Sequence, residues 1–361
     1  MSLILSNDDV LRALEFDAAM AACETAYREL ADGRAVNRPT SQTYLPHTLP
    51  RGTYSFKSVE GGVQAFGVMA LRITSDVVRE EEVSGTLRLN KVPVADGKFC
   101  GLVQIYSVET GALVAIMPDG IIQQARVAIT SGLAMRAMAR EDSHTLALVG
   151  TGDQARAHVK ALRAARPFTR VQVYSPNPAH RARFVQEMIA GGAGAPGPLG
   201  RPACEVVATE SVEACVAGAD VICTATNASR AIVTGAHLRP GVHYNAIREF
   251  ELDESVFEKA DVTVIHTRFG GAHHYLPPGV NHLPGVRREK PRDWSRYPEI
   301  GELLVGRAAG RTRPDQITFF LNNIGTGVQF AAVGHSVLAR ARQLGLGHEV
   351  PTDWFLQDIK P

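Results

Sequence analysis

The pattern of apolar and polar positions predicts two parts of different character along the chain. Residues 8–33 have the spacing of helices, and Gly33 stands where the last of them would end. Residues 53–76 contain two strand candidates, an alternating segment at 54–58 and an apolar run at 67–73 that one arginine interrupts. The chain therefore opens with a mixed α+β part.

A predicted hairpin and a long helix continue this first part. Residues 101–106 and 112–116 are apolar strand candidates, and the Glu-Thr-Gly tripeptide between them has the composition of a turn. A helix rich in alanine is expected from about residue 120 to residue 140. We take residues 1–125 as a first α+β module.

From residue 145 onward, short and wholly apolar strand candidates alternate with helices. This alternation is typical of a doubly wound α/β fold, whose parallel strands are buried on both faces. The strand candidates are residues 145–149, 170–174, 204–208, 220–224, 243–247 and 261–265. We predict an α/β chain with a Rossmann-type sheet, and we expect helical structure from about residue 317 to the end.

A glycine-containing turn follows the first of these strands and opens a helix. It matches the dinucleotide-binding pattern GxGxxA, in which Gly150 permits the tight turn and Gly152 lets the backbone approach a pyrophosphate. Ala155 lets the helix pack close to the strand, and the helix N-terminus offers free N–H groups to the anion. The alternative is a glycine turn that binds nothing. The predicted cofactor residues here are Gly150, Thr151, Gly152, Asp153, Gln154 and Ala155.

The end of the second strand bears on the choice between NAD(H) and NADP(H). An NAD site places Asp or Glu there to hold the ribose, and this chain has neither between residues 173 and 183. Ser175 and Asn177 can bond a 2′-phosphate, and Arg181 or Arg183 can pair with it. We therefore favour NADP(H) over NAD(H), the alternative being that both arginines are solvated helix residues.

Composition limits the remaining classes of function. There are 38 Lys and Arg against 37 Asp and Glu, so the basic surplus of a nucleic-acid-binding protein is absent. No apolar run approaches the roughly 18–20 residues that cross a membrane, and the N-terminus lacks the basic region of a secretory signal. The five cysteines are scattered and no HExxH motif occurs. We expect a cytoplasmic protein with reduced thiols, no metal, and no nucleic-acid or membrane partner.

The order of these motifs resembles the ornithine cyclodeaminase/mu-crystallin family over nearly the whole chain. The likeness includes the glycine turn and the segment from residue 224 to residue 247. The resemblance implies a homodimer in which the NAD(P)-binding Rossmann domain, residues 126–316, is inserted into a discontinuous domain. Residues 1–125 and 317–361 would form that second domain, which binds substrate and dimerises. The resemblance also adds three cofactor residues, Thr224, Ala225 and Thr226.

The family resemblance also implies the substrate and its anchor. Family members are NAD(P)-dependent enzymes that act on amino acids or cyclic imines. The family's substrate arginine corresponds to Arg126, and Arg38 falls near its other carboxylate-binding arginine. Arginine suits bidentate capture of a carboxylate, although each residue has the alternative of being an ordinary surface arginine.

Three positions depart from the family pattern. The family's catalytic lysine is replaced by Arg72, which stays charged and is a poor proton donor; Lys57 is an alternative source of an amine. The acidic residue after the family's NAxG motif is missing, and Glu249 is a candidate replacement unless it merely pairs with its neighbour Arg248. The aspartate of the last helix is Phe330.

These observations favour an NAD(P)H-dependent oxidoreductase, of the imine reductase or amino-acid dehydrogenase type, acting on a small carboxylate-bearing imine, amino acid or keto acid. Arg38, Arg72 and Arg126 would orient the substrate, and Lys57, Arg72 or Glu249 would take part in proton transfer. The alternatives are a redox-neutral amino-acid cyclodeaminase and a crystallin-like protein that binds ligands without catalysis. Residues 268–298 have no periodicity and are expected to form a lid or a surface excursion.

Overall fold

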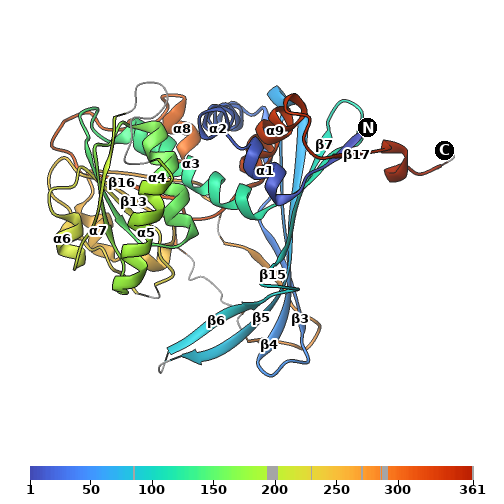
Figure 1. Cartoon of the computed structure of the whole chain (residues 1–361), viewed down its shortest axis with the longest axis horizontal. Helices are drawn as coiled ribbons and strands as arrows, with labels where there is room; N and C mark the ends of the chain where they lie inside the picture. Colours follow the sequence, from blue (N-terminus) through green and yellow to red (C-terminus); the bar gives the residue numbers. More distant parts are fainter. Residues whose placement is uncertain are drawn as a thin grey trace.

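A computed structural model describes residues 1–83, 86–192, 202–228, 230–269, 271–284, 286 and 292–359. Two β-sheets organise the described chain, with helices between them and around the second sheet (Figure 1). Among the described helices, none is long and apolar enough to cross a membrane.

The larger sheet has ten strands and is built mainly from the first part of the chain. Its order is β15-β3-β4-β5-β7-β8-β1-β17, with β2 also paired to β4 and β6 to β5. The bounds are β1 Ser2–Ile4, β2 Ala35–Asn37, β3 Ser41–Pro46, β4 Gly52–Val63, β5 Val68–Val83, β6 Thr86–Val92, β7 Cys100–Ser107, β8 Leu113–Pro118, β15 His273–Tyr275 and β17 His348–Val350. The predicted hairpin is confirmed, since β7 and β8 pair antiparallel.

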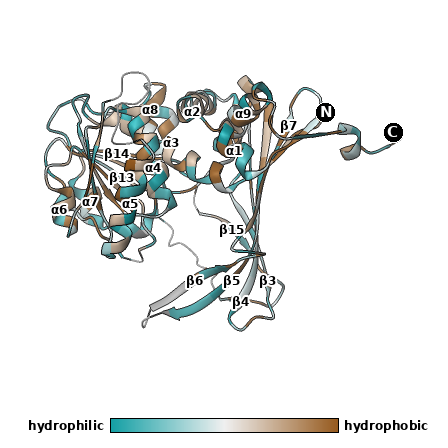
Figure 2. Cartoon of the chain, viewed as in Figure 1, coloured by the Kyte–Doolittle hydropathy of each residue, from teal (hydrophilic) through white to brown (hydrophobic). Residues whose placement is uncertain are grey.

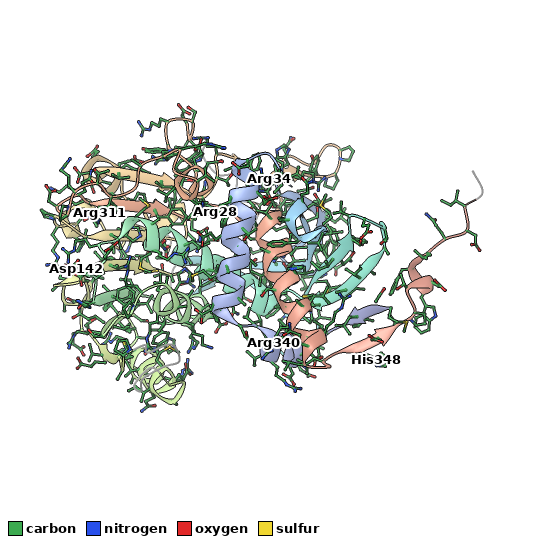
Figure 3. All side chains as sticks on the ribbon, turned by 90° about the horizontal axis from the view of Figure 1, so that it is seen from above. Arg28, Arg34, Asp142, Arg311, Arg340 and His348 are labelled. Atoms are coloured by element: carbon green, nitrogen blue, oxygen red, sulfur yellow. The ribbon has the colours of Figure 1, made fainter. Side chains whose placement is uncertain are left out.

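Four helices cover one face of the ten-stranded sheet, because their apolar sides need a partner surface. They are α1 (Asn7–Ala13), α2 (Phe16–Ala31), the first half of α3 (Gly120–Met138), and α9 (Gly327–Gln343). Seen from above, α2 and α9 lie side by side between the two sheets (Figure 3). The sheet is apolar beneath these helices and becomes hydrophilic toward β3, β4 and β6 (Figure 2).

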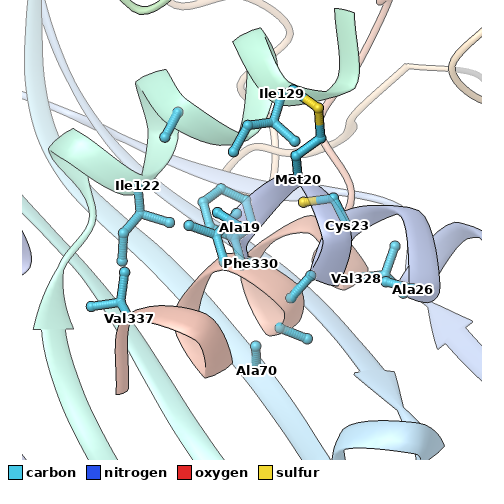
Figure 4. Packing of buried hydrophobic residues seen from close by; sticks show 14 of the residues in the cluster. Ala19, Met20, Cys23, Ala26, Ala70, Ile122, Ile129, Val328, Phe330 and Val337 are labelled. Carbon is cyan, nitrogen blue, oxygen red and sulfur yellow. The ribbon is translucent and has the colours of Figure 1, made fainter. Parts of the chain in front are cut away.

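The core under these helices contains an aromatic ring from the last helix. Phe330 of α9 is 1% exposed and packs with Met20 and Cys23 of α2 and Ile129 of α3 (Figure 4). This packing joins the C-terminal helix to the N-terminal part of the chain, as the family resemblance implies. Removing a fully buried side chain of this size typically costs about 3–5 kcal/mol of stability.

The smaller sheet has seven strands, all parallel, in the order β11-β10-β9-β12-β13-β16-β14. Its strands are β9 Thr145–Val149, β10 Arg170–Tyr174, β11 Glu205–Ala208, β12 Val221–Thr224, β13 His243–Ala246, β14 Val262–Ile265 and β16 Thr318–Leu321. The accompanying helices are α4 Asp153–Ala165, α5 Pro178–Ala190, α6 Val212–Val216, α7 Glu254–Lys259 and α8 Ile300–Leu304. The sheet extends from β9 in both directions, with β10 and β11 on one side and β12 and β13 on the other. The predicted Rossmann-type α/β class is therefore confirmed.

One strand of this sheet corrects the expected helical end of the chain. The sequence predicts a helix from about residue 317 and assigns this segment to the first domain, but β16 lies between β13 and β14. Periodicity cannot separate a buried strand from a buried helix in so short an apolar run. The chain therefore returns to the ten-stranded sheet after Leu321 rather than at residue 317.

The excursion at residues 268–298 also departs from the expected domain boundary. Its strand β15 leaves the Rossmann part and adds to the edge of the ten-stranded sheet, parallel to β3. The Tyr44 hydroxyl lies 2.8 Å from His274 Nδ1, and the Thr53 hydroxyl donates to the Pro284 carbonyl at 2.8 Å. The described part of this excursion is therefore a strap between the two sheets; residues 270, 285 and 287–291 lie outside the described chain.

Candidate active site

The glycine turn between β9 and α4 has the geometry that a dinucleotide needs. Gly150 has φ +123°, and a side chain there would overlap the carbonyl oxygen of Ala225, so only glycine fits. A Cβ on Gly152 would meet nothing within 4 Å, which leaves its backbone open to a ligand. Ala155 is fully buried beneath the helix. These residues, together with the N-terminus of α4, fit the pyrophosphate of a dinucleotide.

A second wall of this site is held by a buried carboxylate that the sequence analysis missed. Glu251 is fully buried, and one of its oxygens accepts hydrogen bonds from the Thr226 backbone N–H, at 2.6 Å, and from the Thr226 hydroxyl. The Thr224 hydroxyl donates to its other oxygen at 3.2 Å. Burial raises the pKa of Glu251, against the hydrogen bonds from both threonines. Glu251 lies only two residues after Glu249, and no motif in the sequence distinguishes one carboxylate from the other.

The end of β10 uses its polar side chains within the protein. The Asn177 side chain caps α5 by accepting from the Ala179 and His180 N–H groups. Arg181 is buried, donates to the Ser175 carbonyl at 2.6 Å, and pairs with Glu210 at 2.9 Å. Asn177 and Arg181 therefore lie where they were predicted, but each already has a partner.

Arg72 lies on the face of β5 that looks toward α9, and a carboxylate neutralises it. Its Nε donates to Asp119 Oδ2 at 2.8 Å, and its Nη2 lies 2.6 Å from the same oxygen. Both residues are 8% exposed. The Asp119 carboxylate occupies space that a side chain on Gly101 would need, so β7 makes room for it. A buried ion pair of this kind has no net charge.

Arg126 lies on helix α3, and its hydrogen-bond partners, unlike that of Arg72, carry no charge. Its Nη1 donates to Gln329 Oε1 at 2.9 Å and its Nε to Gln123 Oε1 at 3.2 Å, and both acceptors are neutral amides. The guanidinium carbons of Arg126 and Arg72 lie 5.3 and 5.4 Å from the centre of the Phe330 ring. Burial and the nearby Arg72 lower the pKa of Arg126 to about 9.

A chain of buried hydrogen bonds holds Gln329 in place behind Arg126. Gln329 Nε2 donates to the Thr130 hydroxyl at 2.6 Å, which lies 2.6 Å from the Tyr27 hydroxyl. The Tyr27 hydroxyl is 3.0 Å from His266 Nε2, just beyond the end of β14. Burial lowers the pKa of His266 to about 3, so this ring is neutral and can accept from tyrosine. Only the position of His266 after a parallel strand, where ligands commonly bind, could have pointed to it.

The other predicted site residues lie in different surroundings. Arg38 has a half-exposed side chain and bonds Ser58 and Glu60 at 3.0 and 2.8 Å. Lys57 of β4 is paired opposite Thr74, two residues from Arg72 on the same face of the sheet, and has an interaction partner. Glu249 pairs with Arg292 at 3.1 Å rather than with the two buried arginines.

Helix α3 connects the arginine to the dinucleotide turn. Its second half packs against α4, and the Ser131 hydroxyl lies 3.1 Å from His158 Nε2 of that helix. A side chain on Gly132 would press on the Ala161 backbone, so the two helices are in close contact. Helix α3 therefore carries Arg126 in its first half and, in its second half, contacts the middle of the helix that follows the glycine turn.

Fold and site together define a protein with a Rossmann-type sheet, a glycine turn of the dinucleotide-binding type and a buried cationic site. The chain belongs to the ornithine cyclodeaminase/mu-crystallin family, which it matches over residues 97–343. A Δ1-pyrroline-2-carboxylate reductase of Bacillus cereus is 25% identical over 357 residues, which cover 96% of this chain and 99% of that relative. The resemblance stated from the motifs is therefore confirmed.

Two solved structures share the fold over nearly the whole chain. The Δ1-pyrroline-2-carboxylate reductase of Thermococcus litoralis, in complex with NADH and L-proline, has a TM-score of 0.74 and 22% identity, covering 96% of this chain and 100% of that chain. The iminosuccinate reductase of Paracoccus denitrificans, in complex with NAD+, has a TM-score of 0.70 and 18% identity, covering 97% and 99%. At these identities the likeness concerns the fold alone.

Proposed function

We propose that this chain is a cytoplasmic, NAD(P)H-dependent reductase of a small carboxylate-bearing imine. Family membership and the activities named for its relatives, Δ1-pyrroline-2-carboxylate and iminosuccinate reduction, agree with an oxidoreductase acting on carbon–nitrogen bonds. Its five cysteines are free, which supports a reducing compartment.

The observation that carries the proposal is a buried cation, Arg126, on helix α3, which packs against the helix that follows the glycine turn. The Arg126 guanidinium is fixed by its hydrogen bonds from Nε to Gln123 and from Nη1 to Gln329, and its other N–H groups are the proposed donors to a carboxylate. Gly150 and Gly152 shape the turn that would receive the dinucleotide, and a bound NAD(P)H supplies the hydride for reduction. Holding the carboxylate rigidly orients the carbon next to it, which is the main contribution expected of the protein.

For the proton donor we favour Lys57 over Glu249. Lys57 and Arg72 are diagonal neighbours on adjacent antiparallel strands, and such neighbours are about 7–8 Å apart at their backbones, within reach of long side chains. The pairing of Glu249 with Arg292 argues for a structural role. Replacing Lys57 by Met should lower kcat far more than it raises KM, whereas Glu249→Gln should change neither by more than a few fold. The reverse result would make Glu249 the donor.

For the cofactor we retain the preference for NADP(H) over NAD(H). The absence of an acidic side chain after β10 and the position of Arg181 support it. Glu210, whose side chain is 88% exposed, is a partner that a 2′-phosphate can replace. Titration should show tighter binding of NADPH than of NADH, and Glu210→Gln should increase that difference. Tighter binding of NADH would contradict the preference.

We further propose a homodimer through the open face of the ten-stranded sheet. The helices packed on this sheet lie on its other face (Figure 1), and this face carries the partly exposed side chains Met69, Leu71, Ile73, Leu102 and Ile116. Light scattering should give twice the chain mass, and charged residues at Leu71 and Ile73 should give monomers. A wild-type monomer at micromolar concentration would contradict the proposal.

The test of the activity is a substrate panel with purified protein. With Δ1-pyrroline-2-carboxylate, or with pyruvate and ammonia, the protein should oxidise NAD(P)H. It should form one molecule of the corresponding amino acid for each molecule of NAD(P)H that is oxidised. A cyclodeaminase would instead release ammonia from ornithine with no net change in the cofactor. Dinucleotide binding without turnover on any member of the panel would favour the crystallin-like alternative.

A further inference from the structure

The three predicted substrate arginines differ in how their charges are balanced. Arg38 has Glu60 beside it, and Arg72 has Asp119. Within the part of the chain that the structure describes, no carboxylate lies within ion-pairing distance of Arg126. A bound anion can therefore pair with Arg126, whose positive charge has no carboxylate partner among the described residues.

The Arg72–Asp119 pair lies close to this unmatched charge. The guanidinium carbons of Arg72 and Arg126 lie 5.4 and 5.3 Å from the centre of the Phe330 ring, and Arg72 acts electrostatically on Arg126. Asp119 is fixed because it precedes α3, because its backbone N–H bonds the Gly101 carbonyl at 3.0 Å, and because its carboxylate fills the space over Gly101. Arg72 is thus held by an acid that cannot easily move away.

We propose that Asp119 makes this site selective for substrates with a single carboxylate, because it neutralises Arg72, the arginine beside Arg126 that could receive a second carboxylate. This inference rests on the proposed function and narrows its substrate class. A dicarboxylate would bring its second charge against the occupied Arg72 and the Asp119 carboxylate, where it gains no partner and meets a like charge. Substrates with an apolar or cyclic side chain avoid this cost.

The selectivity can be measured by binding, independently of turnover. L-Alanine and L-aspartate share the α-amino acid part and differ by one carboxylate. Titrated into the full chain saturated with oxidised dinucleotide, L-alanine should bind at least about tenfold more tightly than L-aspartate, the factor expected for one charge-assisted contact. Asp119→Asn should free Arg72 and raise the affinity for L-aspartate at least about tenfold.

Two matched variants distinguish charge balance from general disturbance. Asp76→Asn removes another buried acid on the same face of the sheet, one that pairs with Lys91 at 2.8 Å, and should leave the alanine-to-aspartate ratio unchanged. The double variant Arg72→Gln with Asp119→Asn removes both charges and should restore the preference for L-alanine. If Asp119→Asn does not fold, a wild type that binds L-aspartate as tightly as L-alanine still overturns the inference.

Each outcome bears on one claim. Tighter wild-type binding of L-aspartate, or an Asp119→Asn variant with an unchanged ratio, overturns the inference while the reductase proposal stands. Loss of L-alanine binding in the double variant would mean that Arg72 itself holds the substrate carboxylate, which also overturns it. Failure of the wild type to bind either amino acid overturns the inference and the proposed function together.

Discussion

At the scale of single residues, the central element is a buried arginine whose partners are neutral. Desolvation of a charged group is costly, and Gln123 and Gln329 give hydrogen bonds without cancelling the charge. An incoming carboxylate recovers much of that cost. Arg126→Ala should therefore lower kcat/KM by about 100-fold or more.

The control for this variant lies on the same helix. Arg136 is partly exposed, pairs with Glu24, and lies ten residues along α3 from Arg126. Arg136→Ala should change kcat/KM by less than about threefold, since exposed ion pairs contribute little. Equal losses in the two variants would assign the effect to the helix rather than to carboxylate binding.

Gln329 offers a second residue-scale test. Replacing it by Glu keeps the shape but places a carboxylate 2.9 Å from Arg126 Nη1, where it would act as an internal substrate mimic. Gln329→Glu should raise the substrate KM by about 100-fold with the dinucleotide affinity retained, and thermal melting measures separately the loss of the Nε2–Thr130 hydrogen bond. An unchanged KM would show that Arg126 does not bind the carboxylate.

The pKa of Arg126 predicts a pH dependence of substrate binding. Burial and the neighbouring Arg72 lower the pKa of this guanidinium to about 9, so the charged form that binds anions is lost as pH rises through that value. The Kd of a carboxylate inhibitor should be constant below a pH of about 8 and rise about tenfold per pH unit above a pH of about 9. A constant Kd up to a pH of about 11 would mean that Arg126 stays charged.

At the scale of elements, the glycine turn allows a loss of stability to be distinguished from a loss of dinucleotide binding. Gly150 has a positive φ and touches the Ala225 backbone, whereas Gly152 has φ −82° and open space around it. Gly150→Ala should therefore destabilise the fold, and Gly152→Ala should melt like the wild type yet bind dinucleotide at least about tenfold more weakly. Thermal melting and cofactor titration of both variants check this. Equal dinucleotide affinity in Gly152→Ala would place the pyrophosphate elsewhere.

The same scale shows what could be predicted from sequence. The turn at 150–155 was predictable because its whole signal lies within one strand, one turn and one helix. The partner of Arg72 was not, since Asp119 is 47 residues away on another element, and Gln329 is 203 residues from Arg126. Buried hydrogen bonds such as that between Tyr27 and His266 depend on how helices pack on the sheets, and no local pattern encodes them.

At the scale of the molecule, several contacts between described residues tie the two sheets together, and three of them bear on the candidate site. Helix α3 carries Arg126 and packs on α4, the Tyr27–His266 contact joins α2 to the end of β14, and the strap strand β15 joins the edge of the larger sheet. Arg126 and the glycine turn are therefore held by one connected framework. Such a framework favours a fixed geometry between the two bound molecules.

The most direct test of the account follows hydrogen from cofactor to product. With pyruvate and ammonia as substrates, NAD(P)H that carries deuterium at C4 of the nicotinamide should yield alanine with one deuterium at its α-carbon, in proportion to the cofactor consumed. Mass spectrometry of the product measures this. Alanine without deuterium from the labelled cofactor, or no alanine at all from this and every other imine tried, would contradict the proposal that this chain is an imine reductase.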